Sequence, residues 1–430
     1  MNDDTATQRY LPRIVDGELS ALLSDLPAVS IEGAKGVGKT ETARRRAATR
    51  RELDRPGAID VIQAEPDRLV RGAEPVLIDE WQRYPPAGAL GRRAVDAARR
   101  PGRGILPGSA SDDIAGTHSG AGRIVTVRMR PLSLAERRVD TPSVSLAALL
   151  TGVRPAIAGH TRVGLERYVE EILAGGFPGM RGGSGRARRA ELDGYIDRIV
   201  DRELPEQGVR TRNPAMLRRW LRAYAAATAT STSYDRLRDA STAGEGDKPA
   251  RSTMRPYRDT LERLRILDPV LPWLPGGGQL SRLNVASKHH LVDPALAARV
   301  LGVDAGALLE PAPVVPAIPR DGTLLGALFE SLVTQSLRVY AQAAEAAVNH
   351  LRTWGGELEV DLVVVRGDQR VVAVEVKLAA TVGDRDVRAL CRLRDRVGPQ
   401  LLDAAIVTTG ADAYRRRDGI AVVPASLLGP

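Results

Sequence analysis

Eight consecutive residues, Gly33-Ala34-Lys35-Gly36-Val37-Gly38-Lys39-Thr40, form a complete GxxxxGK[ST] pattern, the Walker A signature of a phosphate-binding loop. In such a loop, successive backbone N–H groups surround the β-phosphate, and the lysine, here Lys39, reaches the β- and γ-phosphate oxygens. Glycines at 36 and 38 permit backbone conformations that a Cβ atom would forbid. The Thr40 hydroxyl is the expected Mg²⁺ ligand from this loop. The pattern therefore predicts that residues 33–40 bind ATP together with Mg²⁺.

A second group of chemically capable residues follows about forty positions later. Val76-Leu77-Ile78-Asp79-Glu80 is an apolar run that ends in two carboxylates. It has the composition of a buried parallel strand whose polar residues lie at the carboxyl end, where ligands bind in open α/β sheets. Asp79 is expected to hold the Mg²⁺, and Glu80 to orient or deprotonate the attacking water. The pairing with residues 33–40 favours nucleotide hydrolysis over binding alone.

A third group lies near the end of the chain. Asp361 is followed fourteen residues later by Glu375-Val376-Lys377, the D…ExK spacing of the PD-(D/E)xK nuclease core. Strand periodicity places Glu375 and Lys377 on one face, with Asp361 on the adjacent strand. Asp361, Glu375 and the accessory acid Glu330 are the candidate metal ligands, and Lys377 would help to activate water against a phosphodiester. The alternatives are a polar face on an ordinary hairpin and a core kept only for binding.

The composition favours a nucleic-acid partner, but the excess of arginine behind its positive charge has a second explanation. The chain has 430 residues, a net charge of +9 and one cysteine, Cys391, which suits a reducing compartment. Of 62 basic residues only five are lysines: Lys35, Lys39, Lys248, Lys288 and Lys377. This bias indicates GC-rich codon usage as much as a binding surface. It also makes lysine informative at Lys39 and Lys377, where the chemistry needs a compact ammonium.

The elements that must position the first two groups are read from the apolar runs. Strands are expected at 27–31, 59–62, 76–79, 104–106 and 124–129, and a helix at 41–51. The strand at 104–106 would place Ser109 near the γ-phosphate. Arg123, just before the last strand, is interpreted either as a sensor or arginine finger or as an ordinary surface arginine.

Helical periodicity dominates the middle of the chain, at 165–209, 214–224, 233–238 and 253–267. The last of these is basic and amphipathic, and a two-strand wing near 268–283 would complete a winged helix whose third helix enters a major groove. A helix packed in an interdomain scaffold is the alternative. After a proline-rich joint at 311–316, a helix at 323–341, a hairpin of 357–365 with 371–377, a helix at 384–396 and a strand at 404–408 are expected.

These segments in this order resemble the prokaryotic AAA+ ATPases that carry an ATPase domain followed by a conserved C-terminal domain of unknown function. The resemblance rests on IEGAKGVGKT, VLIDEWQRYP, GAGRIVTVRMRPLSLAE, YIDRIVDRELPE, LVDPALA and ELEVDLVVV…VVAVEVK. It implies a nucleotide site at Lys39, Thr40, Asp79 and Glu80, a sensor or finger at Arg123, and motif positions of unknown role at Lys288 and Asp293. Pro107 departs from the family, because a hydrogen-bonding Thr or Asn is expected in its place.

The sequence thus predicts an α/β protein with a P-loop AAA+ domain (1–140), a helical lid or linker (141–210), a winged-helix-like domain (211–310) and a PD-(D/E)xK-like domain (318–430). The predicted function is Mg²⁺-dependent ATP binding and slow hydrolysis, coupled to a C-terminal module that contacts nucleic acid. An ATP-regulated nuclease and a nucleotide-dependent protein-interaction or transcription switch are the alternatives. DNA, a protein and further copies of the chain are candidate partners. No apolar run of membrane-spanning length and no signal peptide are evident, so a cytoplasmic location is expected.

Overall fold

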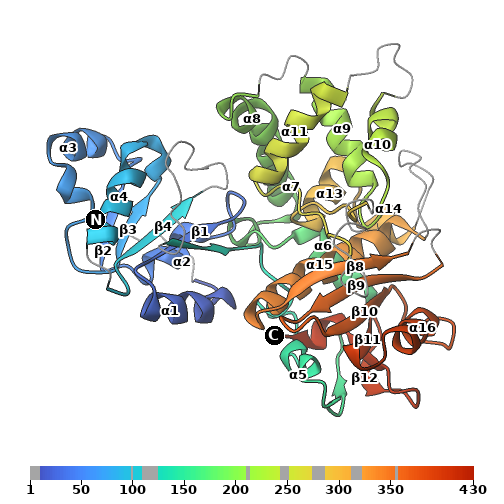
Figure 1. The fold of residues 1–430 in the computed structure, drawn as a ribbon. Coiled ribbons are helices and arrows are strands. Elements are labelled where there is room, and N and C mark those ends of the chain that lie inside the picture. Colours follow the sequence, from blue (N-terminus) through green and yellow to red (C-terminus); the bar gives the residue numbers. More distant parts are fainter. Residues whose placement is uncertain are drawn as a thin grey trace. The chain divides into compact units, whose positions relative to one another are not determined.

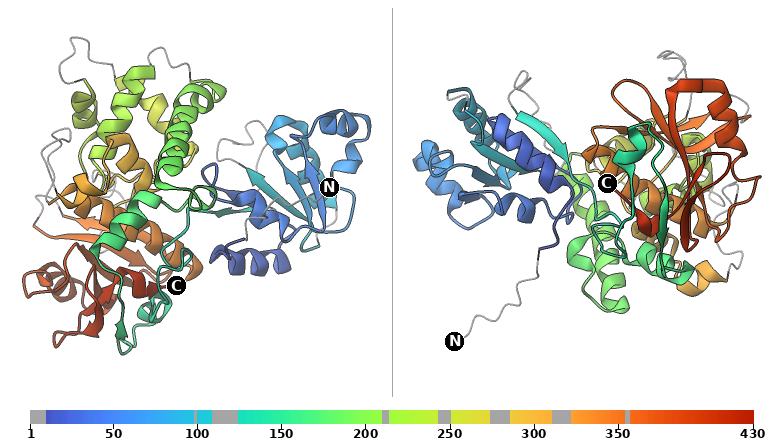
Figure 2. Two further views of the ribbon diagram at one scale, coloured as in Figure 1. Left: turned by 180° about the vertical axis from the view of Figure 1, so that it is seen from behind. Right: turned by 90° about the horizontal axis from the view of Figure 1, so that it is seen from below.

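The computed structural model describes residues 10–97, 100–108, 124–209, 214–242, 251–273, 286–310, 322–353 and 357–430. The chain divides into two compact units, Met1–Met129 and Arg130–Pro430. Figures 1 and 2 show the first unit in blue to cyan and the second in green to red.

The first unit is built on a five-stranded sheet in the order β2-β3-β4-β1-β5, in which every neighbouring pair is parallel. Its strands are β1 (Ala28–Glu32), β2 (Thr49–Glu52), β3 (Val76–Asp79), β4 (Gly104–Gly108) and β5 (Ile124–Arg128). Its helices are α1 (Val15–Asp25), α2 (Lys39–Arg44), α3 (Ala58–Ala64) and α4 (Pro86–Ala97), with short 3-10 turns at Pro66–Leu69 and Trp81–Arg83. The predicted P-loop α/β fold with a parallel sheet is therefore confirmed.

Two strands at the centre of this sheet bring the predicted nucleotide site together. β1 and β3 lie on either side of β4, so their carboxyl ends meet at one edge of the sheet. All four residues of β3 are buried, as its apolar composition requires. Pro107, which has no N–H, pairs with Ile31 of β1 but lies beyond the last β4 residue paired with β3, Ile105.

The structure corrects two local predictions in this unit and adds one strand that was not predicted. Residues 59–62 belong to helix α3 and not to a strand, because a four-residue apolar run fits either element and only Ile62 is buried here. The helix expected at 41–51 ends at Arg44. The true second strand is β2, whose polar sequence, Thr-Arg-Arg-Glu, suits an edge position that pairs only with β3.

The second unit contains a seven-stranded mixed sheet in the order β7-β12-β13-β11-β10-β9-β8. Its strands are β7 (Ala158–His160), β8 (Ala347–Arg352), β9 (Glu359–Val365), β10 (Val371–Lys377), β11 (Leu401–Thr408), β12 (Asp412–Arg415) and β13 (Ala421–Pro424). The predicted hairpin is present as antiparallel β9 and β10, and β10 then pairs in parallel with β11. A separate two-stranded ladder joins β6 (Val144–Ser145) to β14 (Leu428–Gly429).

Helices α15 (Leu324–Ala343) and α16 (Arg388–Val397) pack on the β8–β11 half of this sheet, and the short helix α5 (Leu146–Leu150) contacts β10 and β11 as well (Figure 1). Helix α15 contacts β8, β9 and β10, and α16 contacts β9, β10 and β11. The core around α16 contains Leu390 and Leu393 with strand residues such as Val363 and Ala373, and no residue of α15. Helices α15 and α16 therefore pack against different parts of the core, and α15 can place Glu330 near the β9–β10 hairpin.

The rest of the second unit is mainly helical. Its described helices are α5 (Leu146–Leu150), α6 (Leu165–Ala174), α7 (Gly185–Arg198), a π-helical turn (Ile199–Glu203), α8 (Leu204–Glu206), α9 (Pro214–Ala226), α10 (Tyr234–Ser241), α11 (Arg251–Arg263), α13 (Pro294–Leu301) and α14 (Ala305–Leu309). In the described part of the chain, no helix combines the length and the hydrophobicity that a membrane crossing needs.

An extended segment after α11 pairs with a second one that carries Lys288. Leu267 forms an antiparallel bridge with Leu291, and Val270 forms one with Lys288. The backbone groups of Val270 and Lys288 exchange two hydrogen bonds of 2.9 Å each. Most of the wing expected near 268–283 lies outside the described residues, so the winged helix stays a prediction.

Candidate functional site

The loop between β1 and α2 adopts a conformation that only glycine allows at several positions. A Cβ on Gly33 would collide with the carbonyl oxygen of Met129. Gly36 and Gly38 have φ values of 80° and 99°, in the left-handed region that side chains disfavour. The glycines of the sequence pattern are thus explained by backbone geometry.

The two halves of the predicted nucleotide site meet at this loop. The Thr40 hydroxyl lies 3.3 Å from Asp79 Oδ1, although the two residues are 39 positions apart. The Lys39 ammonium donates hydrogen bonds of 2.7 Å to the Gly33 carbonyl and 3.0 Å to that of Ala34. It therefore lies over the mouth of the loop, where a phosphate would replace carbonyl oxygens as its partners.

The electrostatics at Asp79 fit a bound cation. The residue is only 6% exposed. Burial, and next the charge of Glu80, raise the pKa of the Asp79 carboxyl above its usual value. Magnesium is commonly held by one or two protein oxygens together with phosphates, so Thr40 and Asp79 are suitable as the protein ligands of such a site. No group of three or more His, Cys, Asp or Glu side chains is placed to hold a metal among the described residues.

Glu80 lies at the end of β3 in an unusual backbone conformation. Its φ of 51° puts it in the left-handed region, where a non-glycine residue is uncommon. Its Oε2 accepts a 2.8 Å hydrogen bond from Gln82 Nε2, and its N–H donates to Asp79 Oδ1 at 3.2 Å. Strained residues of this kind are concentrated at functional sites. Arg123 and Ser109, the other residues predicted here, lie outside the described residues.

The predicted C-terminal cluster also forms in the structure. Val374 pairs with Leu362, and the same register continued by one step sets Glu375 opposite Asp361. Lys377 Nζ donates to Glu375 Oε1 at 2.8 Å. Asp361 Oδ2 accepts a 2.9 Å hydrogen bond from the Val376 N–H.

Lys288, which the sequence marks only as a motif position, completes this cluster. Its ammonium donates to Glu330 Oε1 at 2.8 Å and to Asp361 Oδ1 at 3.1 Å. Burial opposes its charge, but Glu330 and Asp361 outweigh burial and raise the pKa of Lys288 above its usual value. Besides the motif position, its sequence signal was the rarity of lysine, because few basic positions in this chain are lysine.

Asp293, the other motif position of unknown role, is a buried structural anchor. Its Oδ1 accepts the Ala295 N–H at 2.9 Å and thereby caps α13. Its Oδ2 accepts the Gly176 N–H at 2.6 Å and the Gln335 amide at 3.3 Å. This carboxylate therefore joins α13, the loop after α6 and helix α15.

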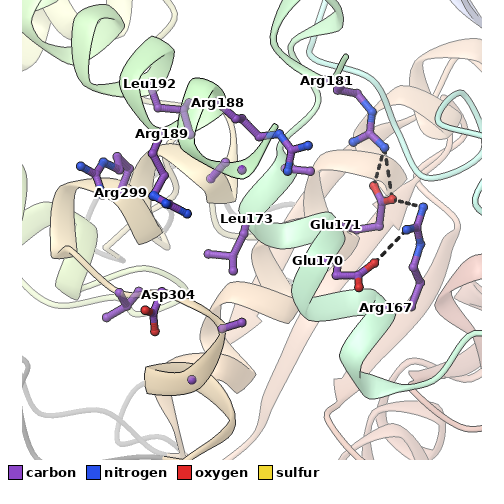
Figure 3. Close-up of a pocket in the computed structure, with 16 residues that line it drawn as sticks. Arg167, Glu170, Glu171, Leu173, Arg181, Arg188, Arg189, Leu192, Arg299 and Asp304 are labelled. Atoms are coloured by element: carbon purple, nitrogen blue, oxygen red, sulfur yellow. Dashed lines mark hydrogen bonds and ion pairs between the residues drawn. The ribbon is translucent and has the colours of Figure 1, made fainter. Parts of the chain in front are cut away.

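A cavity of about 630 Å³ in the second unit contains none of the predicted site residues (Figure 3). Arginines surround it, but several are already paired: Glu171 contacts Arg167 at 2.8 Å and Arg181 at 2.9 Å. The cavity is lined by Arg167, Glu170, Glu171, Leu173, Ala174, Arg181, Gly185, Arg188, Arg189, Leu192, Ala295, Arg299, Val303, Asp304, Ala305 and Gly306.

Comparison with known families agrees with this geometry. The sequence model of an AAA domain matches residues 25–137, and that of the domain of unknown function DUF4143 matches residues 325–428. A further domain of unknown function, DUF8612, matches residues 165–307. The chain therefore joins an N-terminal AAA domain, a class of ATPase domain, to a C-terminal domain of unknown function, and the resemblance seen in the sequence is confirmed.

Individual relatives extend over most of the chain. Uncharacterised proteins of Mycobacterium bovis and Mycobacterium tuberculosis are each 26% identical over 418 residues, which is 95% of this chain and 82% of the relative. A solved structure of a Walker-type ATPase of Pyrococcus abyssi covers 66% of this chain and 94% of its own, with 18% identity and a TM-score of 0.37.

Proposed function

We propose that the protein binds ATP with Mg²⁺ at residues 33–40 and hydrolyses it slowly, and that the bound nucleotide regulates the second unit. The observation that carries this proposal is the contact between Thr40 and Asp79, which joins the two predicted halves of the nucleotide site. In this proposal the loop amides and Lys39 bind phosphates, and Thr40 and Asp79 hold the metal. Glu80 positions the attacking water.

The decisive test is titration calorimetry of ATP and Mg²⁺ against the full chain and its Lys39→Ala variant. The variant is expected to lose binding, because Lys39 occupies the GK[ST] position of the pattern, from which the lysine ammonium reaches the β- and γ-phosphate oxygens. Arg71→Ala removes a 69% exposed cation from the same unit and is the matched control. Equal heats of ATP binding in the parent and in Lys39→Ala would refute the proposal.

We further propose that the regulated partner of the second unit is nucleic acid. Support comes from α9, α10 and α11, which precede the antiparallel segments at 267–270 and 288–291, an order that suits a winged helix. The positive charge of α11 is reduced, since Arg258 contacts Asp259 at 2.7 Å and Arg255 contacts it at 3.5 Å. A weak, salt-dependent interaction is therefore expected.

A gel retardation series over increasing salt distinguishes the candidate partners. Contacts with phosphates give an affinity that falls steeply with salt, whereas protein docking generally does not. Arg255→Ala should weaken binding to all sequences alike and reduce the salt slope by about one unit. Absence of retardation at low salt would favour the alternative, a nucleotide switch that binds a protein.

The other alternative, an ATP-regulated nuclease, needs a divalent cation at Glu330, Asp361 and Glu375. The contact of Lys288 with two of these carboxylates stands against it. Plasmid DNA incubated with the protein and Mn²⁺ or Mg²⁺ should remain uncut. Cutting that disappears in Asp361→Ala would establish the nuclease instead.

A further inference from the structure

The C-terminal cluster contains a positive charge at its centre. Lys288 Nζ lies within hydrogen-bond distance of Glu330 and of Asp361, and its side chain is 2% exposed, against 13% and 15% for those two acids. The ammonium is thus the most deeply buried of the three groups. It reaches the carboxylates from the extended segment at 288–291, and not from the hairpin or from α15.

The position of Lys288 is fixed by its backbone. Its N–H and carbonyl both bond to Val270 at 2.9 Å, so the residue cannot shift without breaking this pairing. Its neighbour His289 is also held, because the Nε2–H of His289 donates to the Thr232 carbonyl at 2.6 Å. The ammonium is therefore delivered to the carboxylates by a fixed segment.

A divalent cation does not fit this arrangement. It would need the same oxygens, Glu330 Oε1 and Asp361 Oδ1, at about 2.0–2.1 Å for Mg²⁺. The ammonium already lies between them at 2.8 and 3.1 Å, and it would repel the metal. The second oxygen of Asp361 is engaged by the Val376 N–H.

Most of the negative charge of the cluster is neutralised without a metal. Two ammonium groups, of Lys288 and Lys377, face three carboxylates. Burial, and next the charge of Asp361, raise the pKa of Glu330 to about 8 and that of Glu375 to about 7. Burial also acts on Asp361, but Lys288 outweighs it and lowers the pKa of that carboxyl. The two ammonium groups thus leave an excess of at most one negative charge on the three carboxylates.

The residue type supports the same conclusion. The chain uses arginine at nearly every basic position, with only five lysines among 62 Lys and Arg residues. A guanidinium is a wide planar fork, whereas an ammonium is a compact point charge that can take the place of an ion. A side chain that takes the place of an ion therefore has to be a lysine, and position 288 has one.

We propose that the Lys288 ammonium occupies the place of a divalent cation in this nuclease-like core, so that the second unit holds its acidic cluster together without metal and does not cleave nucleic acid. Removal of the ammonium should open a divalent-cation site formed by Glu330, Asp361 and Glu375. Glu375 Oε2, which is buried and has no hydrogen-bond partner among the described residues, is the oxygen that most needs such a cation. The proposal does not depend on the nucleotide site.

The test measures Mn²⁺ binding to the full chain without nucleotide. Binding is detected in electron paramagnetic resonance as a loss of the signal of free Mn²⁺. All proteins carry Asp79→Asn, which removes the metal ligand of the first unit. The parent is expected to show no detectable Mn²⁺ binding in the second unit, and Lys288→Ala to bind one ion with a Kd at least tenfold below the weakest binding that the measurement detects. Adding Asp361→Asn to Lys288→Ala should abolish this binding.

The proposal would be overturned if the parent bound Mn²⁺ and lost this binding in Asp361→Asn. It would also be overturned if a folded Lys288→Ala variant bound no Mn²⁺. If Lys288→Ala folds only when Mn²⁺ is present, the metal has replaced the ammonium and the proposal is supported. If Lys288→Ala remains unfolded with Mn²⁺, the triple variant Lys288→Met, Asp361→Asn, Glu330→Gln, which has neither the ammonium nor its two acidic partners, decides. Failure of this triple variant to fold would show that Lys288 is needed for packing and not as a counter-ion, and the proposal would be wrong.

Discussion

At the residue scale, Glu80 combines a strained backbone with a predicted catalytic role. An L-residue in the left-handed region costs about 1–2 kcal/mol, and glycine would avoid that cost at a comparable loss of entropy. The conformation turns the chain out of β3 immediately after Asp79. A residue kept under such strain should contribute to function more than to stability.

Replacement of this carboxylate separates the two contributions. Glu80→Gln should leave ATP binding intact and reduce ATP turnover by about 10²–10⁴-fold, the usual effect of losing a general base. Glu80→Gly should lose turnover equally while its free energy of unfolding stays within about 1 kcal/mol of the parent. A phosphate-release assay and urea unfolding measure the two effects. Unchanged turnover in Glu80→Gln would remove Glu80 from the mechanism.

His289 makes the second unit sensitive to acid. Burial lowers its pKa to about 4, although its hydrogen bond to the Thr232 carbonyl partly opposes this shift. In the unfolded chain the pKa is about 6.5, so the unfolded state binds more protons between these values. The stability contributed by neutral His289 is therefore complete above about pH 6.5 and declines as the pH falls towards 4.

At pH 5 this loss amounts to about 2 kcal/mol relative to pH 7. His289→Gln keeps an N–H for the Thr232 carbonyl but has no titrating ring, so its stability should fall by about 2 kcal/mol less over the same interval. Urea unfolding at pH 7 and pH 5 provides the comparison. Equal losses in the parent and the variant would show that His289 is not the group responsible.

At the element scale, the start of α2 depends on a glycine. Gly38 precedes the helix with a φ of 99°. Gly38→Ala should lower the free energy of unfolding of the first unit by about 1–2 kcal/mol, because alanine in this conformation brings its Cβ against the backbone. Gly17 of α1 is the matched control: it has ordinary helical geometry and nothing within 4 Å of an added Cβ. Gly17→Ala should raise stability by about 0.5–1 kcal/mol, and a loss of similar size in both variants would contradict this explanation.

The elements also show what the sequence could predict. The apolar runs were sufficient to predict strands β1, β3, β9 and β10, because a strand that is buried on both faces has apolar residues at nearly every position. β2 was missed because an edge strand tolerates polar residues, and β7 because three residues, Ala-Gly-His, carry no periodicity. The role of Lys288 was hidden because its partners lie 42 and 73 positions away.

At the scale of the whole molecule, the division into two units predicts a selective response to ligand. ATP that binds only the native first unit stabilises that unit by about 2.7 kcal/mol at a concentration of one hundred times Kd. Calorimetric unfolding should then show one transition that moves to higher temperature and a second that moves less, by an amount set by the free energy that couples the two units. Lys39→Ala should lose the shift. A shift of both transitions by the same amount would show that the units unfold together.

The pairing of β7 with β12 and of β6 with β14 has a consequence for biosynthesis. Residues 144–160 leave the ribosome long before residues 412–429, which contain their pairing partners, β12 in the seven-stranded sheet and β14 in the separate ladder. The strand edges of this early segment stay unpaired until residues 412–429 have been translated. The first unit can reach its native state before these residues are made, whereas the second is completed only after them, and deletion of residues 412–429 should leave it prone to capture by chaperones.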